Sequence, residues 1–213
     1  MKQMDFLKKF GVGSVAISAA LASGQALAHH PMGGMTPETF WQGFLSGVGH
    51  PMIGMDHFAF LIVAALLAVA LKGPARFLAP LAFVGATLGG TMLHVGAAEL
   101  PLAESLVALS VLVGGVLVLT RNYLGAALLS GVFALSGVVH GYAFGEAVVG
   151  AEATPILAYL VGLSVIQYAV VVGGVLGMEK LAARSEKARG LVARLSSMAA
   201  ALTGGVFLLQ SLA

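Results

Sequence analysis

Six apolar stretches, each of roughly 17 to 25 residues, limit the folds that this chain can adopt. They cover about residues 54–71, 77–94, 103–120, 123–140, 155–178 and 191–212. Each stretch is long enough for a helix to cross a bilayer, where a helix satisfies its own backbone hydrogen bonds. With 59% hydrophobic residues, 9% charged residues and a mean hydropathy of +0.97, the chain could not solvate its surface as a soluble domain. We therefore predict an all-α polytopic membrane protein with six transmembrane helices.

The first 28 residues have the layout of a secretory signal peptide. Lys2, Lys8 and Lys9 precede an apolar stretch over residues 10–22, and Ala26-Leu27-Ala28 follows. That stretch is too short to span a bilayer comfortably, which favours cleavage after Ala28 over an uncleaved anchor. Residues 29–213 are then expected to form a single helical bundle. The mature chain is formally neutral, so the pI of 9.0 implies no nucleic acid partner.

The distribution of charge predicts the orientation, because short cytoplasmic loops collect Lys and Arg. With the mature amino terminus outside, the inner segments receive all the cations of the mature chain, which are Lys72, Arg76, Arg121, Lys180, Arg184, Lys187, Arg189 and Arg194. Most acidic residues fall outside, and only Glu179 and Glu186 lie inside. We expect a bacterial inner membrane protein with both mature termini on the periplasmic side.

All six histidines fall in the outer tail or near outer helix ends. They are His29, His30, His50, His57, His94 and His140. A single histidine there is most simply an interfacial side chain bonded to backbone or water. Six on one side, with carboxylates and without competing cations, instead indicate a metal site. Cysteine is absent, so nitrogen, oxygen or thioether sulfur must supply the ligands.

The segment His50-Pro-Met-Ile-Gly-Met-Asp-His57 lies at the start of the first apolar stretch. Ionisable groups at this border are costly and indicate function. Asp56 is expected to be a ligand or an acceptor that fixes an imidazole tautomer, although it could also favour the helix dipole. Glu104, three residues after Pro101, has the same two interpretations.

Residues 139–146 form a second group of interest. Gly141 and Gly145 allow a sharp turn or a close helix approach, which can fold His140 and Glu146 toward one site. The alternative is an ordinary helix end with a glycine stop. Thioethers at the same depth, from Met52, Met55 and Met92, are further candidate ligands or plain apolar filling.

These residues resemble the HupE/UreJ family of small membrane proteins. The resemblance rests on His50-Pro51, Gly54, Asp56-His57, the stretch PLAESLVALS over 101–110, His140-Gly141 and Gly145-Glu146, in the same order. It implies a six-helix secondary permease for nickel or cobalt, often associated with hydrogenase or urease maturation. It also implies that His50, Asp56, His57, His140 and Glu146 are important for transport.

The chain departs from the family pattern at two places. Phe144 stands where similar proteins often have a histidine, and Ile166-Gln167 replaces a Leu-His pair. His94 and the methionines are candidates to replace the missing imidazole ligands. Because thioether sulfur suits copper, copper remains a possible substrate beside nickel and cobalt. Cleavage after Ala28 would leave His29 with a free amine, so His29 and His30 form either a chelating tail or an uninvolved one.

We therefore predict a permease that collects a divalent transition metal outside and passes it inward. The alternatives are a membrane metalloenzyme and a metal-binding sensor or assembly factor that transports nothing. No nucleotide-binding loop of the Gly-x-x-x-x-Gly-Lys type occurs, so movement is downhill or proton-coupled. No cofactor beyond the transported ion is expected, and a homo-oligomer is an open option.

Four further features bear on the fold. Gln167 and Tyr168 are the candidate polar groups along a path inward, or else they bond neighbouring helices. Residues 38–49 are expected to be an interfacial or partly inserted element that leads to a turn at His50. The basic loop over 180–194 is most simply a determinant of topology, with contact to anionic lipid as the weaker option. Close helix packing is expected at three glycine pairs, which are Gly85/Gly89, Gly137/Gly141 and Gly173/Gly177.

Overall fold

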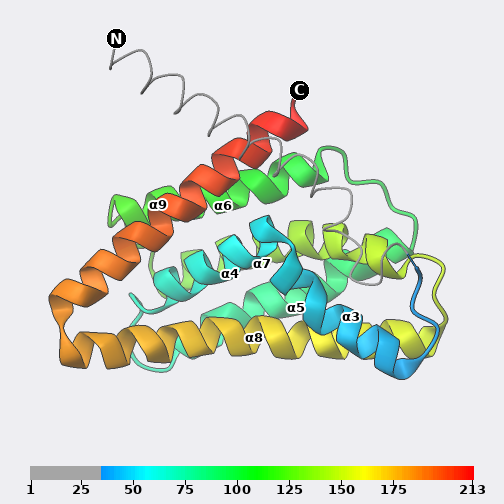
Figure 1. The fold of residues 1–213 in the computed structure, drawn as a ribbon, viewed down its shortest axis with the longest axis horizontal. Coiled ribbons are helices and arrows are strands. Elements are labelled where there is room, and N and C mark those ends of the chain that lie inside the picture. Colours follow the sequence, from blue (N-terminus) through cyan, green and yellow to red (C-terminus); the bar gives the residue numbers. More distant parts are fainter. Residues whose placement is uncertain (1–34) are drawn as a thin grey trace, which may run out of the picture.

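The computed structural model describes residues 35–213, and all regular structure within that range is helical (Figure 1). The expected signal peptide over 1–28, His29 and His30 lie outside the described residues. In chain order the elements are α3 (Phe40–Ile53), α4 (Met55–Ala68), α5 (Ala75–Val95), α6 (Ala103–Leu119), α7 (Ala126–Gly145), η1 (Glu146–Val148), α8 (Ala153–Arg184) and α9 (Glu186–Ser211).

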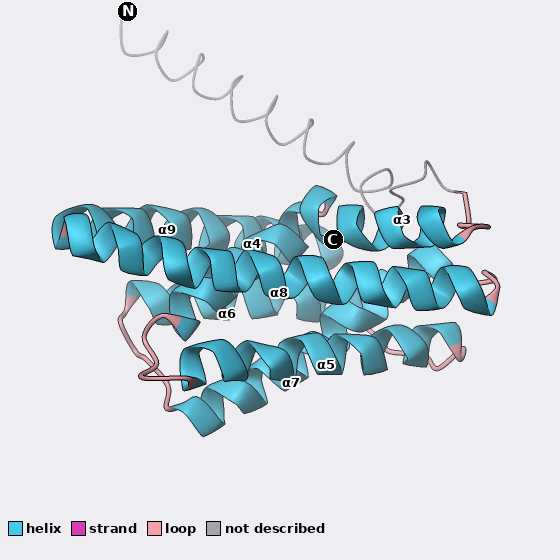
Figure 2. Cartoon of the chain, turned by 90° about the horizontal axis from the view of Figure 1, so that it is seen from below, coloured by secondary structure: helices cyan, strands magenta, loops and turns pink. Residues whose placement is uncertain are grey.

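Helix α4 is the centre of the bundle. Ten of its 14 residues are buried, among them Phe60, Leu61 and Val63. It packs against α6, α8 and α9 and more lightly against α5. A helix that is apolar on all sides is expected to be enclosed by others, and the sequence of α4 fits that rule. Around it, α5 pairs with α7, α3 with α8 and α6 with α9 (Figures 1 and 2).

Helices α3 and α4 form one broken span. Gly54 lies between them in an extended conformation, with φ −68° and ψ 108°, and the two axes are bent by 77°. The backbone N–H of Gly54 still donates to the His50 carbonyl, at 3.0 Å. Thr39 begins α3 with a capping box to Gln42. The expected turn at His50 is therefore wrong in detail, because His50 lies in the last helical turn of α3 and the chain bends at Gly54.

Close helix packing depends on glycines, although not on every pair expected. Gly141 faces the Thr87 carbonyl and Gly137 the Phe83 carbonyl so closely that a methyl group would overlap either oxygen, which brings α7 against α5. Gly85, Gly89, Gly173 and Gly177 instead face open space within 4 Å. The neighbouring Gly90 and Gly174 make the contacts, since the helices are rotated by about one residue from the expected phase.

Length and composition support four or five of the six expected membrane spans. Within the described residues, α5, α8, α9 and the continuous stretch of α7 with η1 are long and apolar enough to cross a membrane, and the bent α3–α4 pair makes a fifth. Helix α6 is apolar but shorter, with 17 residues. Each of the six predicted stretches does contain a helix.

The predicted boundaries differ most at α7 and α8. We expected helices over 123–140 and 155–178, whereas α7 covers Ala126–Gly145 and α8 covers Ala153–Arg184. His140 does not end its helix because its ring is bonded inside the protein and needs no water. Helix α8 extends past the apolar stretch, and Glu179 on this extension pairs with Arg76 at the start of α5.

Candidate metal site

Three imidazoles from three helices meet in the interior of the bundle. His50 comes from the last turn of α3, His57 from the first turn of α4 and His140 from α7. Their exposed fractions are 0%, 1% and 0%. The His57 and His140 Nδ1 atoms lie 2.8 Å apart, and the ring centroids of His50 and His57 are 5.9 Å apart. The structure thus brings together three of the residues singled out in the sequence, and we name them the histidine cluster.

Hydrogen bonds around His140 assign the tautomers of two rings. Ser110 donates its hydroxyl hydrogen to the Val107 carbonyl, at 2.7 Å. Its oxygen therefore accepts from the Nε2–H of His140, at 2.9 Å. The neutral His140 ring then has its lone pair at Nδ1 and accepts from the Nδ1–H of His57. It follows that the lone pair of neutral His57 is at Nε2.

The same reasoning applies to His50. Tyr159 donates its hydroxyl hydrogen to the carbonyl of Phe144, at 2.9 Å. The phenol oxygen therefore accepts from His50 Nδ1–H, at 2.8 Å, which leaves the lone pair of neutral His50 at Nε2. A hydrogen bond on one ring nitrogen that fixes the lone pair on the other is the usual outer support of a metal-binding histidine.

Aromatic rings surround the histidine cluster and shield it from water. The Phe144 ring is the closest to His57, with a centroid distance of 4.1 Å, and is 4.9 Å from His50. Phe60 lies 4.5 Å from the His140 ring. Phe144, the position at which the family resemblance led us to expect a histidine, thus lies among the three imidazoles.

Asp56 supports the backbone and bonds to no imidazole within residues 35–213. It is 6% exposed, and its Oδ1 accepts from the main-chain N–H of His57 at 2.8 Å. This position satisfies one of the free N–H groups at the start of α4. Gly54 lies close to the same carboxylate, because a methyl group on Gly54 would lie 3.4 Å from Asp56 Oδ1 and 2.8 Å from Cδ2 of His57.

Three other predicted ligands line a separate cavity near the C-terminal ends of α5 and α7, which the charge distribution predicts to lie outside. His94, Glu104 and Glu146 are on its wall together with Tyr142, and its volume is about 290 Å³. His94 Nδ1–H donates to the Tyr142 carbonyl at 2.7 Å, so the lone pair of the neutral ring is at Nε2. We name this the outer cavity. The predicted single set of ligands is thus divided between two places.

Neither place is a preformed metal site. Within residues 35–213, no three His, Asp or Glu side chains are arranged to hold one ion as they stand. The candidate thioether ligands contribute little, since Met52, Met55 and Met92 are 41%, 53% and 46% exposed on the surface. Metal binding by His50, Asp56, His57, His94, Glu104, His140 and Glu146 stays a prediction, and His29 and His30 are outside the described part.

Sequence reasoning missed two residues that position the histidine cluster, Ser110 and Tyr159. Ser110 belongs to the stretch that carried the family resemblance, but only its bond to His140 gives it a role. Tyr159 is fully buried on the face of α8 that also carries Leu163 and Gln167. Gln167 is itself 0% exposed, and its side-chain amide has no hydrogen-bond partner among residues 35–213. Two polar residues eight positions apart on one face of an apolar helix, Tyr159 and Gln167, were the available signal.

Comparison with known proteins identifies relatives of this chain. The family model described as HupE / UreJ protein matches residues 17–207. Protein HupE of Rhizobium leguminosarum bv. viciae is 31% identical over 167 residues, which cover 78% of this chain and 84% of that relative. No solved structure matches the chain.

Proposed function

Because the chain belongs to the HupE/UreJ family, a family of membrane permease type, we propose that it is a secondary transporter that takes up a divalent transition metal ion. Nickel or cobalt is the proposed substrate, and the protein is not an enzyme. The observation that carries the proposal is the histidine cluster, in which two buried rings from α3 and α4 have their lone pairs at Nε2. Imidazole nitrogen is a suitable ligand for these metals.

The spacing of the cluster supports a shared ion. Metal-bound imidazole nitrogens lie about 2.0–2.1 Å from the ion, so two rings on one ion have centroids about 5 to 6.5 Å apart. The 5.9 Å between His50 and His57 falls in that range. Asp56 is proposed to hold the His57 backbone during binding. The exposed methionines give no support to a thioether site for copper.

The outer cavity is the proposed entrance. His94, Glu104 and Glu146 would replace part of the hydration shell of an arriving ion before it reaches the histidine cluster. His29 and His30 would capture the ion further out. The charge distribution supports a periplasmic entrance, an inner membrane location and both mature termini outside. Six crossings are proposed, with the short α6 held between α4 and α9.

We propose that Gln167 is the next polar group that an ion contacts after the histidine cluster on its way inward. Its buried amide lies two helical turns beyond Tyr159 on the same face of α8. A buried amide without a protein partner is expected to bond to water or a passing ion. Movement would be downhill or proton-coupled. A link to the maturation of a nickel enzyme follows from the family resemblance alone.

Uptake by reconstituted vesicles tests the proposal. Purified full-length protein in liposomes with an internal metal-sensitive dye should admit Ni²⁺ or Co²⁺ faster than empty liposomes, and His57→Ala should reduce the rate at least about tenfold. His57→Gln keeps a polar side chain of similar size, so a loss of uptake in this variant as well would not be explained by a cavity that destabilises the fold. Met55→Leu on the same turn of α4 is the control, because Met55 is exposed. Tight binding without entry would contradict transport, and unchanged uptake by both His57 variants would contradict the site.

A further inference from the structure

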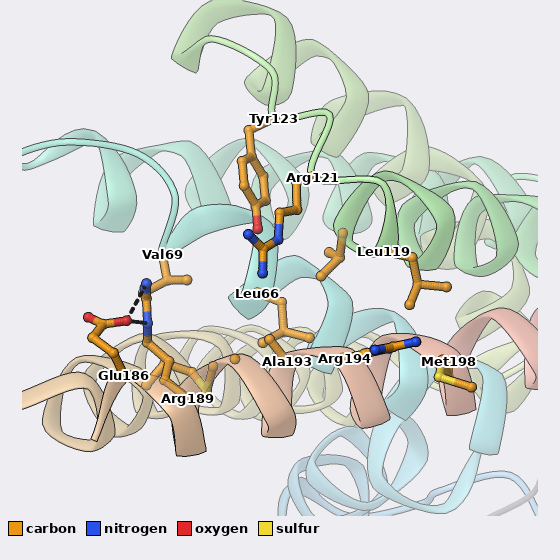
Figure 3. A pocket seen from close by; sticks show the side chains of 13 residues that line it. Leu66, Val69, Leu119, Arg121, Tyr123, Glu186, Arg189, Ala193, Arg194 and Met198 are labelled. Carbon is orange, nitrogen blue, oxygen red and sulfur yellow. Dashed lines mark hydrogen bonds and ion pairs between the residues drawn. The ribbon is translucent and has the colours of Figure 1, made fainter. Parts of the chain in front are cut away.

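A large cavity lies at the opposite end of the bundle from the histidine cluster. Its volume is about 740 Å³, within the usual range for ligand sites. Leu66 near the end of α4 and its C-cap Val69 contribute to its wall, whereas His57 is at the start of α4, about 14 to 18 Å away along the helix axis. The rest of the wall comes from the end of α6, the loop after it, α8 and α9 (Figure 3). We name this the inner cavity.

The inner cavity carries an excess of positive charge. Arg121, Arg189 and Arg194 line it, and Glu186 is its acidic residue. Glu186 already forms an ion pair with Arg189, with 2.9 Å between Glu186 Oε2 and Arg189 Nη2. Neither Arg121 nor Arg194 has an ion-pair partner within residues 35–213. Figure 3 shows Arg121 reaching in from the loop after α6, while Arg194 lies on α9 across the cavity. Two guanidinium groups are therefore available to an anion.

The backbone at Arg121 supports a role for this side chain. Its φ of 54° lies in the left-handed region, which a long side chain adopts rarely. Such a conformation persists where surrounding structure imposes it and is enriched at ligand sites. Here the loop that joins α6 to α7 holds the Arg121 side chain over the cavity, beside Tyr123 (Figure 3).

The remaining wall is apolar and indicates the class of anion. Val118, Leu119, Met178 and Met198 face the cavity together with the α4 residues. A small inorganic anion would leave this apolar surface in contact with water. A phospholipid offers a phosphodiester for the arginines and hydrocarbon for the wall, and basic pockets at the cytoplasmic ends of helices recognise anionic headgroups.

We propose that the inner cavity binds an anionic phospholipid, with Arg121 and Arg194 donating to its phosphate oxygens. Guanidinium binds phosphate through two parallel charge-assisted hydrogen bonds, which gives both strength and orientation. The glycerol and the first carbons of the acyl chains would contact the apolar wall. This site is independent of the proposed metal transport, because it shares no residue with the histidine cluster or the outer cavity.

Native mass spectrometry of the full chain in detergent tests the site. The probes are phosphatidylglycerol and phosphatidylcholine with identical acyl chains. Wild-type protein should retain phosphatidylglycerol preferentially, and Arg121→Gln/Arg194→Gln should lose at least about tenfold in affinity for it. The matched control is Arg184→Gln/Lys187→Gln, which removes the same charge from the same end of the bundle but from side chains outside the cavity. The control should bind as wild type.

Three results would overturn the proposal. Equal loss in the two double variants would mean that binding depends on overall surface charge. Unchanged binding in the cavity variant would remove the two arginines from the site. Displacement of phosphatidylglycerol by equimolar inorganic phosphate would identify a free anion as the ligand. Arg194→Lys keeps the charge but loses the two-pronged contact, so its partial loss of affinity separates recognition from a folding defect.

Discussion

The Nδ1 atoms of His57 and His140 face each other at 2.8 Å in the interior of the bundle. One of them must carry the hydrogen and the other the lone pair, so the contact cannot form between two protonated rings. Acidification should therefore destabilise the protein in detergent, since a free imidazole is protonated below about pH 6.5. Thermal unfolding measured at about pH 7.5 and about pH 5.5 checks this, because these two values lie on either side of the pKa of a free imidazole.

The double variant His57→Phe/His140→Leu is the reference for the acid experiment. It replaces the pair by apolar side chains of similar size and should lose most of the acid sensitivity. An acid response of the same size in the variant would place its origin in other groups.

Tyr159→Phe should weaken metal binding without unfolding the protein. The variant removes the oxygen that accepts from His50 Nδ1–H, so the ring is no longer held with its lone pair at Nε2. Loss of such outer support typically reduces metal affinity by about 10- to 100-fold. Titration calorimetry with Ni²⁺ measures the change. Tyr168→Phe is the control, because that hydroxyl donates to the Phe77 carbonyl and does not belong to the site.

Phe144→His should strengthen metal binding. The Phe144 ring lies 4.1 Å from His57 and 4.9 Å from His50, so a histidine there would add a fourth imidazole to the cluster. We expect the Ni²⁺ affinity to rise at least about tenfold, equivalent to about 1.4 kcal/mol. Phe144→Leu should show no such gain. A histidine variant that folds and binds Ni²⁺ no better than wild type would mean that position 144 does not face the ion.

Gly54→Ala should reduce uptake by displacing one ring. The added methyl group would lie 2.8 Å from Cδ2 of His57, and that buried ring has little room to move. We expect a severalfold lower uptake rate in vesicles with normal insertion. Gly85→Ala serves for comparison because nothing lies within 4 Å of its added methyl group, and its uptake should match wild type.

Gly141→Ala should loosen the contact between α5 and α7. Its methyl group would overlap the Thr87 carbonyl, which belongs to backbone and cannot swing aside. Overpacking of this kind costs about 1–3 kcal/mol. Thermal unfolding of the purified protein measures the loss, and Gly131→Ala on the same helix, in open space, should show none. Equal stability of the two variants would show that α5 and α7 can separate at no cost.

Hydropathy was sufficient to predict the six helices α4 to α9, because each apolar stretch must satisfy its backbone hydrogen bonds in hydrocarbon. It did not predict α3, which was expected only as a short interfacial or partly inserted element. The ends of the helices were harder. His140 was expected to end its helix as a polar residue, whereas bonds to Ser110 and His57 let it continue inside α7. When tertiary contacts make the hydrogen bonds of a histidine ring, as they do for His140, the sequence alone does not show that the helix continues past it.

The candidate site was only partly predictable for a similar reason. Position along the sequence indicated that His57, His94 and His140 lie at one level, but not the direction in which each ring points. That direction depends on how the helices are rotated against each other. On α5, Gly90 rather than Gly89 contacts α7. The His94 ring consequently packs on Tyr142, with centroids 4.3 Å apart, and joins the outer cavity instead of the histidine cluster.

The bend at Gly54 divides one span between two sets of neighbours. Helix α3 carries His50 and is fixed to α8, whereas α4 carries His57 and is fixed mainly to α6, α8 and α9. The two imidazoles thus lie on two helices that are joined only at Gly54. A tilt of α3 or α4 alone would change the distance between the His50 and His57 rings. Under the proposed function, the angle between the two helices would therefore set how tightly these rings hold a metal ion.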